Sequence, residues 1–515
     1  MNGDGGWTAP WIDELDGFDG LSIRALIELR ARQTGDAVWL IDPEAGETLS
    51  YADLLAACRR VAGFLDAEGV AVGASVGFAA SNSADTAAVV LGIAFAGRRA
   101  TAINLVAGAD TIDYVAQHAG CALILHDGVG REALPDTVVQ RTQLATCADA
   151  LAGSPCEAGP AVPPSSDGLL MYTSGTTGRP KGVRLSHGNL IAGGRNTALA
   201  HQIAAGDRAL CVLPLYHING LCVTVFAPLV SGGSVVMPPR FSVTAFWDWI
   251  ATHRCTWFSV VPTQISWLVH AERGRTVDNT EALRFGRSAS APLSPDVHRA
   301  FESRFGVPLI ETMGLTETAA QILSNPMPPG ECKHGSPGVA VGNAVEIIDT
   351  RTGQRCAAGA EGEIRVRGAN VMQGYLDNPE ATAAALDSDG WLCTGDLGRM
   401  DADGYVFVTG RLKELIIKGG ENIAPREIDE ALLTHPDVIE AAAFARPCTD
   451  FGQRVEAGVV LRSTADSTPE TLRAHCVSRV GAFKSPDRVH VLDTLPKGPS
   501  GKVQRLKLAD ALSGQ

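Results

Sequence analysis

The sequence lacks an apolar run long enough to cross a membrane. The longest one extends from Ala87 to Gly97, well short of the ~18 residues that a transmembrane helix needs. The N-terminal stretch, MNGDGGWTAP, also lacks the basic and apolar regions of a secretory signal. We therefore expect a protein without a membrane span that resides in the cytoplasm.

Cysteine pairs and an excess of positive charge are missing as well. The 12 cysteines are scattered, without a C-x-x-C pair or a histidine at metal-ligand spacing, which argues against a zinc site and a disulfide framework. We expect most of them to be small core residues. A formal net charge of -14 argues against a nucleic-acid partner. An anionic substrate must therefore be met by local clusters of Lys, Arg and backbone N–H groups.

The phosphate-binding pattern of P-loop NTPases is also absent. The stretch TSGTTGRPKG at residues 173–182 comes near to it, but counting from Gly175 the position of the last glycine is occupied by Pro180. The chain is therefore not expected to be a P-loop NTPase. The stretch nevertheless combines hydroxyl side chains and Lys181 with glycines, which let a backbone direct its N–H groups at one point.

Two interpretations of this stretch, which we call the phosphate loop, are open. A segment rich in Gly, Ser and Thr is often only a flexible surface loop. Its flanks favour a binding role, because DGLLMY before it predicts a buried strand from Leu169 to Tyr172, and SHGNLIAGG after it predicts a helix that opens at Ser186. A glycine loop between a strand and a helix is a common anion site, so we expect a bound polyphosphate.

The chain is long enough for several domains. Its 515 residues are 45% hydrophobic. The apolar runs 74–80 and 99–105 flank a helical stretch at about 85–96, which is typical of parallel sheets with crossover helices. After residue 340 the short alternating runs NAVEIID and EGEIRVRG predict antiparallel strands of a small β subdomain. Pro425 predicts the start of one helix, and Thr468 predicts the cap of a second one. We therefore predict a separate α+β domain at the C-terminus.

Further stretches carry groups that suit a nucleotide, each with an ordinary alternative. ETMGLTETA at 311–319 offers Thr316 and Glu317, a hydroxyl and a carboxylate that can hold a phosphate and its Mg²⁺, although a helix N-cap has the same composition. GWLCTGDLG at 390–398 places Asp396 between glycines, where one carboxylate can accept both hydroxyl protons of a ribose. A simple turn aspartate is the alternative there.

Two basic stretches complete the set. GRLKELIIKGGENIAP at 410–425 and LPKGPSGKVQR at 495–505 contain Arg411, Lys413, Lys418 and Lys502 beside glycines. Solvated lysines are the ordinary explanation for such residues.

Taken together, the order and content of these stretches resemble the adenylate-forming (ANL) superfamily of acyl-CoA synthetases, firefly luciferases and nonribosomal adenylation domains. YTSGTTGRPKG is similar to the phosphate loop of that family, PLYHING to its acyl gate, ETMGLTETA to its adenine and magnesium motif, and CTGDLG to its ribose motif. GRLKELIIKGGENI resembles the hinge and pantetheine-tunnel motif, and PKGPSGKVQR the segment with the catalytic lysine. The resemblance covers nearly the whole chain and favours the acyl-CoA synthetase branch.

The resemblance implies an α/β fold with two domains. The large N-terminal domain, residues 1–411, would contain two α/β sheet subdomains plus a small β subdomain, and a smaller mobile α+β lid domain would comprise residues 412–515. The implied enzyme is an acid–thiol ligase of the AMP-forming type. A carboxylic acid and Mg-ATP give acyl-AMP and pyrophosphate, and coenzyme A then displaces AMP. The implied cofactors are ATP or AMP, Mg²⁺ and coenzyme A, and a homodimer is left open.

The resemblance also assigns roles at matching positions. The implied catalytic residues are Lys502, which would bridge the carboxylate and the α-phosphate, Glu317 as the Mg²⁺ ligand with Thr316 beside it, and His217 at the entry of the acyl pocket. A satisfied buried histidine is the alternative for His217. The β- and γ-phosphates would be held by Thr173, Ser174, Gly175, Thr176, Thr177, Gly178 and Lys181.

The remaining nucleotide and coenzyme A contacts follow in the same way. Met313 and Gly314 would face the adenine, and Asp396 and Arg411 the ribose hydroxyls. The hinge would be Lys413, and the pantetheine arm would pass close to the backbone of Gly419 and Gly420, which lack side chains.

Two positions depart from the family pattern. Met313 stands where many relatives carry an aromatic residue that stacks on adenine, and SASAPL, with Ala289 and Ser290, replaces a more glycine-rich sequence. A thioether can pack on a purine less rigidly than a ring does. An alternative function is therefore a thioester-forming enzyme that acts mainly on preformed acyl-AMP.

The sequence predicts a hydrophobic monocarboxylic acid as substrate. Residues 218–226, 260–266 and Met313 would line the acyl pocket, and they offer mainly apolar surface without an obvious cation for a second carboxylate. Aryl, fatty and terpenoid acids all fit.

Other classes are less favoured. The alternatives are a stand-alone adenylation domain that loads a carrier protein, a luciferase-like oxygenase and a non-enzymatic nucleotide-binding protein. The oxygenase is less favoured because the usual peroxisomal ending is absent from the closing residues LSGQ. The chain closes about ten residues after GKVQR, which favours a free-standing ligase that uses coenzyme A.

Overall fold

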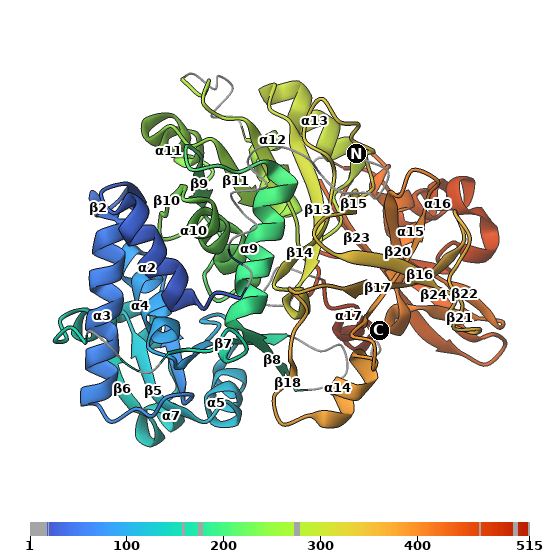
Figure 1. The fold of residues 1–515 in the computed structure, drawn as a ribbon. Coiled ribbons are helices and arrows are strands. Elements are labelled where there is room, and N and C mark those ends of the chain that lie inside the picture. Colours follow the sequence, from blue (N-terminus) through green and yellow to red (C-terminus); the bar gives the residue numbers. More distant parts are fainter. Residues whose placement is uncertain are drawn as a thin grey trace. The chain divides into compact units, whose positions relative to one another are not determined.

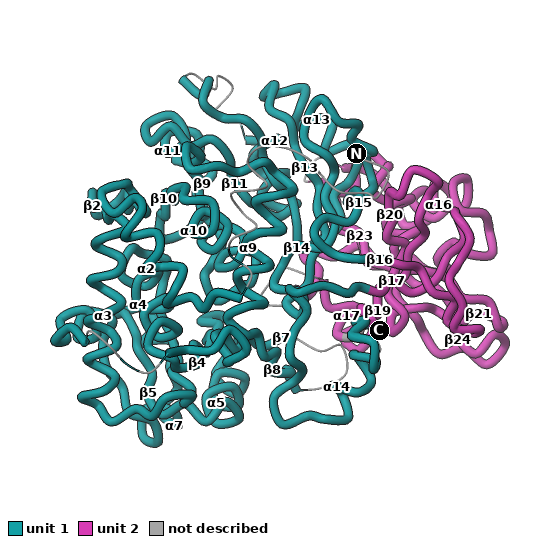
Figure 2. The backbone as a smooth tube through the Cα atoms, in the orientation of Figure 1, with its two compact units in different colours: residues 1–345, 366–392 teal, residues 346–365, 393–515 magenta. Residues whose placement is uncertain are grey.

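The computed structural model describes residues 18, 20–156, 159, 161–173, 179–271, 279–462, 465–497 and 503–512. The chain divides into two compact units, which Figure 2 shows in two colours. Unit 1 comprises residues 1–345 and 366–392, and unit 2 comprises residues 346–365 and 393–515. Figure 1 labels the helices and strands of both units.

Unit 1 contains a seven-stranded sheet built from alternating strands and helices. In sheet order its strands are β18 (Gly374–Tyr375), β8 (Lys181–Ser186), β7 (Asp167–Thr173), β4 (Arg99–Ala102), β3 (Ser75–Ala79), β5 (Cys121–His126) and β6 (Gln143–Thr146). The buried helix α4 (Ala84–Phe95) connects β3 to β4, and these two strands pair in parallel, which confirms the predicted crossover. β8 is antiparallel to both of its neighbours.

A nine-stranded sheet forms the other half of unit 1. In sheet order its strands are β15 (Val339–Ala340), β14 (Ala320–Ser324), β13 (Leu309–Leu315), β12 (Phe285–Ser288), β11 (Trp257–Val260), β9 (Arg208–Cys211), β10 (Ser234–Val236), β1 (Val38–Asp42) and β2 (Glu47–Ser50). The strands from β13 to β1 pair in parallel, and the outer strands are antiparallel. β11 and β12 are buried along their whole length, as expected of a parallel sheet covered on both faces.

Helices cover these sheets and separate them. They are α2 (Ile23–Thr34), α3 (Tyr51–Ala67), α5 (Ala109–His118), α6 (Gly128–Ala133), α7 (Asp136–Arg141), α8 (Cys147–Leu151), α9 (His187–His201), α10 (Ala227–Ser231), α11 (Phe246–His253), α12 (Pro262–His270), α13 (Pro295–Phe305) and α14 (Pro379–Ala385), with the π-helix η1 (Asn219–Phe226) and the 3₁₀ helix η2 (Thr316–Thr318). α9 contacts β7 and β8 of one sheet and β14 of the other, and runs between them in Figure 1. Almost all of its residues are buried, which fits this central position.

Unit 2 combines most of a small β sheet with an α+β fold. The four-stranded sheet is β16 (Ala344–Ile348), β17 (Glu361–Arg367), β19 (Leu392–Met400) and β20 (Val406–Arg411). The α+β part contains the strands β22 (Glu421–Ile423), β21 (Ile416–Lys418), β24 (Gly452–Leu461), β23 (Val438–Cys448) and β25 (Arg488–Val491), the helices α15 (Pro425–Leu433), α16 (Pro469–Lys484) and α17 (Arg505–Ala511), and the 3₁₀ helix η3 (Leu412–Glu414). The predicted starts of α15 at Pro425 and of α16 after the cap Thr468 are confirmed. The domain boundary after Arg411 concerns which part of the chain moves, and it stays a prediction.

The phosphate loop is followed by an unpredicted strand, so the expected strand–loop–helix order is wrong, whereas the predicted helix start at Ser186 is confirmed. The expected strand is present as β7, but Lys181 begins β8, which pairs antiparallel with β7 and continues to Ser186. α9 begins only after that strand, with Ser186 as its N-cap. In β8 the side chains of Val183 and Leu185 are buried, an alternation that indicates a strand. The N-terminus of α9 therefore does not follow the loop directly in the chain.

All 12 cysteines are free thiols, and six of them are buried. The prediction that most are core residues therefore holds for half of them. Within the described residues, the longest and most apolar helices fall short of what a membrane crossing requires.

Candidate active site

The ends of parallel strands bring several predicted site segments together in unit 1. β9, β11, β12 and β13 are neighbouring parallel strands, so the loops that follow them lie at one edge of the nine-stranded sheet. These loops lead to His217, Ala289 and Thr316. In open α/β sheets, ligands bind at the carboxyl ends of the strands. The predicted acyl gate, the SASAPL segment and the predicted magnesium motif therefore share one edge.

Lys181, Tyr375 and Glu317 form a polar cluster beside the phosphate loop. The Nζ atom of Lys181 lies 4.7 Å from the centroid of the Tyr375 ring, and the Tyr375 hydroxyl donates a hydrogen bond to Oε1 of Glu317 at 3.0 Å. Burial and then the neighbouring Glu317 carboxylate raise the pKa of Tyr375, so its hydroxyl stays protonated and donates. The structure thus joins the lysine of the phosphate loop and the predicted Mg²⁺ ligand through one tyrosine.

Sequence reasoning missed Tyr375. It lies in β18, a two-residue strand, opposite Val183 of β8. Neither a glycine pattern nor a charge marks its position, and the only local signal is one aromatic residue before a polar run. Its place beside Lys181 and Glu317 is created by the pairing of β18 with β8.

The donor set of Glu317 and Thr316 suits a magnesium ion. Mg²⁺ prefers oxygen ligands, and this pair offers a carboxylate and a hydroxyl in the partly exposed helix η2. The hydrogen bond from Tyr375 occupies one carboxylate oxygen and orients the group without cancelling its charge. These two residues therefore fit a bound Mg²⁺, and their role as its ligands stays a prediction.

Gly314 is a glycine for a structural reason. A Cβ atom at this position would come within 1.6 Å of the carbonyl oxygen of Ala320 in β14. The pairing of β13 with β14 shifts register at this point, between Met313 and Gly314. The neighbouring Met313 is partly exposed, and the contacts of both residues with an adenine stay predictions.

The acyl-gate segment leads into a π-helix. The ring of His217 packs edge-on against Tyr216, with ring centroids 4.9 Å apart, and His217 is partly exposed. Two residues later, Asn219 begins η1. π-helices are rare and frequently occur at functional sites. The role of His217 at the pocket entry stays a prediction, but its exposure does not match the alternative of a fully buried histidine.

In unit 2 the two predicted ribose residues are neighbours. Asp396 of β19 and Arg411 of β20 are paired positions of antiparallel strands, and Nε of Arg411 lies 2.8 Å from Oδ1 of Asp396. The side chain of Asp396 is 6% exposed, whereas that of Arg411 is 38% exposed. The structure therefore brings together the carboxylate and the guanidinium that were assigned to one sugar.

The glycines of the predicted tunnel form a tight turn in unit 2. Gly419 and Gly420 connect β21 to β22 as a two-residue turn with φ of +60° and +85°, values that favour glycine. Both are exposed, as is Lys413 in η3. Lys418 is 5% exposed, and its Nζ donates to the carbonyl oxygen of Phe483 at 3.1 Å, so the interpretation as a solvated lysine is wrong for this residue.

Some predicted positions lie outside the described residues. They are Ser174, Gly175, Thr176, Thr177, Gly178 and Lys502. Thr173, at the end of β7, is described and partly exposed. The roles of these residues stay predictions.

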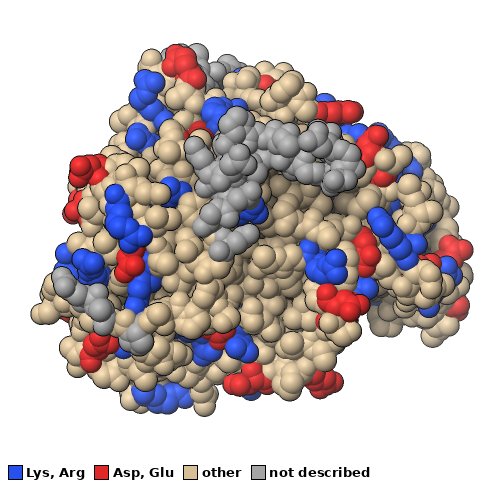
Figure 3. Space-filling view, in the orientation of Figure 1, with Lys and Arg blue, Asp and Glu red and all other residues tan. Residues whose placement is uncertain are grey.

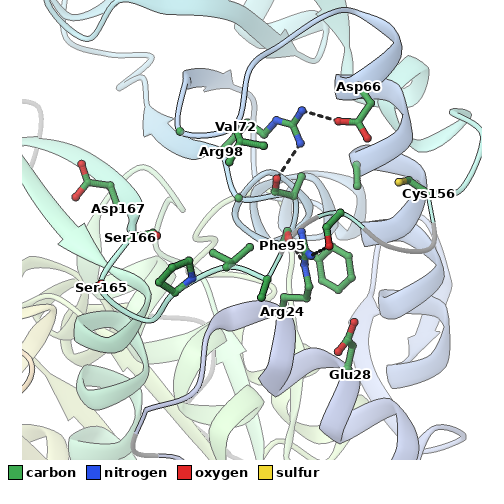
Figure 4. Close-up of a pocket in the computed structure, with 18 of the residues that line it drawn as sticks. Arg24, Glu28, Asp66, Val72, Phe95, Arg98, Cys156, Ser165, Ser166 and Asp167 are labelled. Carbon is green, nitrogen blue, oxygen red and sulfur yellow. Dashed lines mark hydrogen bonds and ion pairs between the residues drawn. The ribbon is translucent and has the colours of Figure 1, made fainter.

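A cavity of about 390 Å³ in unit 1, shown in Figure 4, is not lined by any of the predicted site residues. Its arginines already have partners. Nε of Arg24 donates to the carbonyl oxygen of Phe95 at 2.8 Å, and Arg98 forms an ion pair with Asp66 at 2.5 Å. Because these cations are satisfied within the fold, we assign the cavity no catalytic role.

Family models match both parts of the chain. A model described as AMP-binding enzyme matches residues 27–376, and one described as AMP-binding enzyme C-terminal domain matches residues 427–502. A sulfoacetate–CoA ligase from Cupriavidus necator is 46% identical over 506 residues, which cover 96% of this chain and 98% of that protein.

Solved structures show the same likeness. ATP-bound MatB from Rhodopseudomonas palustris is similar with a TM-score of 0.88 at 31% identity, covering 95% of this chain and 99% of that chain. The o-succinylbenzoate CoA synthetase MenE from Bacillus subtilis, in complex with its acyl-adenylate intermediate, is similar with a TM-score of 0.85 at 31% identity, covering 94% and 97%. The described geometry and these matches lead to one assignment: the chain belongs to the family of AMP-binding enzymes.

Proposed function

We propose that the protein is an acid–thiol ligase, which activates a carboxylic acid with Mg-ATP to acyl-AMP and transfers the acyl group to coenzyme A. The observation that carries the proposal is the cluster in which Tyr375 joins Lys181 to Glu317. In this cluster a lysine, which suits phosphates, and a carboxylate, which suits a metal ion, both contact the side chain of Tyr375. Membership of the AMP-binding enzymes and the likeness to a CoA ligase over nearly the whole chain support it.

The residues divide the work of the first half-reaction. Lys181 and the N–H groups of the phosphate loop hold the β- and γ-phosphates, and Glu317 with Thr316 holds the Mg²⁺, which neutralises phosphate charge when bound. Asp396 accepts hydrogen bonds from the ribose hydroxyls. A carboxylate and a phosphate repel each other by about 4 kcal/mol at ~4 Å in a near-surface dielectric, and Lys502 offsets this repulsion in the transition state.

The second half-reaction uses the turn at Gly419 and Gly420 in unit 2. After acyl-AMP has formed, residues 412–515 turn about Lys413 and withdraw Lys502. The turn at Gly419 and Gly420 then lies along the pantetheine arm, whose thiol attacks the acyl carbonyl and displaces AMP. His217 borders the entry through which the thiol reaches its target.

Location and partners belong to the same proposal. We place the enzyme in the cytoplasm with a small acid, ATP and coenzyme A as its partners, and light scattering of the purified protein decides between monomer and homodimer. Lys and Arg side chains are scattered among Asp and Glu on the face shown in Figure 3. That pattern and the net charge of -14 give no electrostatic footprint for a nucleic acid.

The structure changes the argument about the acid. The predicted preference for an apolar monocarboxylic acid rested partly on the lack of a cation among the lining residues. Arg287 is hydrogen-bonded to Asn219, the first residue of η1. A cation therefore lies beside the predicted lining residues, and the lack of one no longer supports an apolar monocarboxylic acid. The likeness to a sulfoacetate–CoA ligase makes sulfoacetate the first acid to test.

One assay tests the proposed function. The purified protein is incubated with Mg-ATP, coenzyme A and, one at a time, sulfoacetate, hexanoate and benzoate, while pyrophosphate release and acyl-CoA are measured. The matching synthetic acyl-adenylates are supplied with coenzyme A alone. Pyrophosphate and acyl-CoA from the same free acid are the expected result.

The alternatives give different results in the same assay. Thioester from adenylates, without pyrophosphate release from any matching acid, would favour the enzyme that acts on preformed acyl-AMP. Transfer to a phosphopantetheine carrier protein, but not to coenzyme A, would favour the stand-alone adenylation domain. Nucleotide binding without any turnover would overturn the proposal.

A further inference from the structure

Arg287 is a fully buried cation without a carboxylate partner among the described residues. It lies in β12 and is 1% exposed. Its Nη1 donates to Oδ1 of Asn219 at 2.9 Å and to Oγ of Ser259 at 3.0 Å, and its Nη2 donates to Oε1 of Gln321 at 2.9 Å. All three acceptors are neutral. The Nε–H is buried and makes no hydrogen bond.

Such a charge is costly for the fold. Moving an ion out of water costs several kcal/mol even after relaxation, and buried arginines are usually paired with an acid. Burial lowers the pKa of Arg287 to about 9, so the guanidinium is still charged at neutral pH. A guanidinium offers five N–H groups, and neutral acceptors occupy three of them here. Two N–H groups remain, and the buried Nε–H is one that meets no acceptor among the described residues.

The position of Arg287 connects it with the predicted acyl pocket. Asn219, which accepts its hydrogen bond, follows His217 by two residues and begins the π-helix. The Nδ2 of Asn219 also donates to Oγ of Ser290 at 3.1 Å, in the loop after β12 and within the segment SASAPL that departs from the family pattern. Ser290 has φ of +74°, a strained value for a residue other than glycine, and such strain often marks functional loops. The buried cation is thus hydrogen-bonded to Asn219, which belongs to a segment expected to line the acyl pocket, residues 218–226.

We propose that Arg287 is a specificity residue that binds a second anionic group of the acid, so that the substrates are short acids carrying a sulfonate or a second carboxylate. The inference rests on the proposed ligase function and adds its substrate class. The planar fork of a guanidinium binds two oxygens of such a group at once. A long side chain at this place also limits the room for an extended acyl chain. Asn219 and Gln321 act as positioning residues, since they hold the guanidinium in one orientation.

Two isosteric acids test this role. Sulfoacetate carries a sulfonate, whereas methylsulfonylacetate has nearly the same shape but an uncharged sulfone. With Mg-ATP and coenzyme A, we expect the wild-type kcat/KM to favour sulfoacetate by about 10²-fold or more, because the charged hydrogen bonds form only with the sulfonate. Arg287→Met should lose most of its activity on sulfoacetate and keep its activity on the sulfone, so that the preference disappears.

Two variants control for general damage to the fold. Arg287→Lys keeps the charge without the fork and should retain part of the preference. Arg208→Met removes another arginine of the same sheet, at the amino end of β9, where it donates to the Ser234 hydroxyl and to the carbonyl oxygen of His253. Arg208 is at the opposite end of its strand from the site, so this variant should leave the preference for sulfoacetate unchanged.

Each outcome separates this inference from the proposed function. Equal kcat/KM of the wild type for the two acids would overturn the inference, even if Arg287→Met does not fold. An unchanged preference in Arg287→Met would overturn it as well. Thioester from hexanoate or benzoate alone would leave the ligase function intact and refute the substrate class. A lack of thioester from every acid and every adenylate would refute the function itself.

Discussion

Two arginines, one in each unit, show two uses of an enclosed positive charge. Arg505, at the start of α17, donates to the carboxylates of Asp429 and Glu414 and to the carbonyl oxygen of Ala443. Arg287 donates only to neutral oxygens. Burial lowers the pKa of Arg287. Burial acts in the same direction on Arg505, but the Asp429 and Glu414 carboxylates outweigh it, so the pKa of Arg505 is raised. The charge of Arg505 is balanced by carboxylates within the fold, whereas we assign the charge of Arg287 to an anionic ligand.

The two arginines differ in what their removal would leave behind in the fold. A cation that is paired internally stabilises the segment that contains it, and its loss exposes a partner of opposite sign to an apolar environment. A cation that is held by neutral acceptors leaves no such partner behind when it is removed. The first kind should matter for folding and the second for substrates.

The largest expected effect is on stability, from Arg505→Met. Asp429 is 7% exposed, so the variant leaves a buried carboxylate without its cation and should lower the free energy of unfolding by about 3–5 kcal/mol. Urea unfolding measures the loss, with hydrogen exchange of β23 and β24 to assign it to unit 2. Arg287→Met is the matched variant and should lose much less. If both variants lose the same stability, Arg287 is structural too, and the contrast between the two arginines fails.

The next effect is on adenylation, from Lys502→Ala. Lys502 precedes Arg505 by three residues, yet its predicted role is to neutralise charge in the transition state. The variant should slow acyl-AMP formation by about 10²-fold or more, the scale of losing one transition-state donor. Thioester formation from supplied acyl-AMP and the free energy of unfolding should be unchanged. Single-turnover pyrophosphate release measures the first half-reaction, and equal losses in both would refute the assignment of Lys502 to adenylation.

Elements with a local pattern were predictable from the sequence. α16 follows from Thr468 and Pro469, and the α4 crossover follows from two apolar runs around a helical one. The predicted ribose pair also proved to be neighbours, because Asp396 and Arg411 lie on strands that are close in sequence.

Features created by contacts between distant segments were not predictable. β8 was hidden because its short alternation stands directly before a helix cap and looks like part of the phosphate loop. Tyr375 reaches Glu317 only through the pairing of β18 with β8. Arg287, in the segment FGRSAS, has the local signature of an ordinary surface arginine. Its burial results from η1, β11 and β14, which pack around it.

A third prediction concerns a site without internal partners, the turn at Gly420. A Cβ atom there would meet no atom within 4 Å, so the space beside this turn is open in unit 2. Gly420→Leu should therefore slow thioester formation by about tenfold or more by blocking the pantetheine arm, with adenylation nearly intact. Accumulation of acyl-AMP, followed by mass spectrometry, is the readout.

The matched control for backbone strain is Gly404→Leu. Gly404 has the same φ of +85° and equally open surroundings, but it lies in the turn before β20. Both variants carry the strain of a positive φ, and only Gly420→Leu should separate the two half-reactions. Normal thioester rates in Gly420→Leu would place the tunnel elsewhere.

The smallest expected effect is a pH dependence of stability in unit 1. It comes from Glu302, a carboxylate whose hydrogen-bond partners lie within the fold. Burial opposes its ionisation, but the His298 ring 3.6 Å away and hydrogen bonds with the Leu309 N–H and His334 lower the pKa of Glu302 from 4.5 to about 2. The folded pKa is below the unfolded one, so the stabilisation is present above about pH 4.5 and is lost as the pH falls toward 2. Because a third of the side chain is exposed, we expect about 1 kcal/mol rather than the full shift. Urea unfolding at pH 7, 4.5 and 3 should show a steeper loss for wild type than for Glu302→Gln. As a control, Asp296→Asn removes an exposed ion pair on the same helix and should show the same pH dependence as the wild type. Parallel curves for wild type and Glu302→Gln would show that the Glu302 carboxylate contributes nothing.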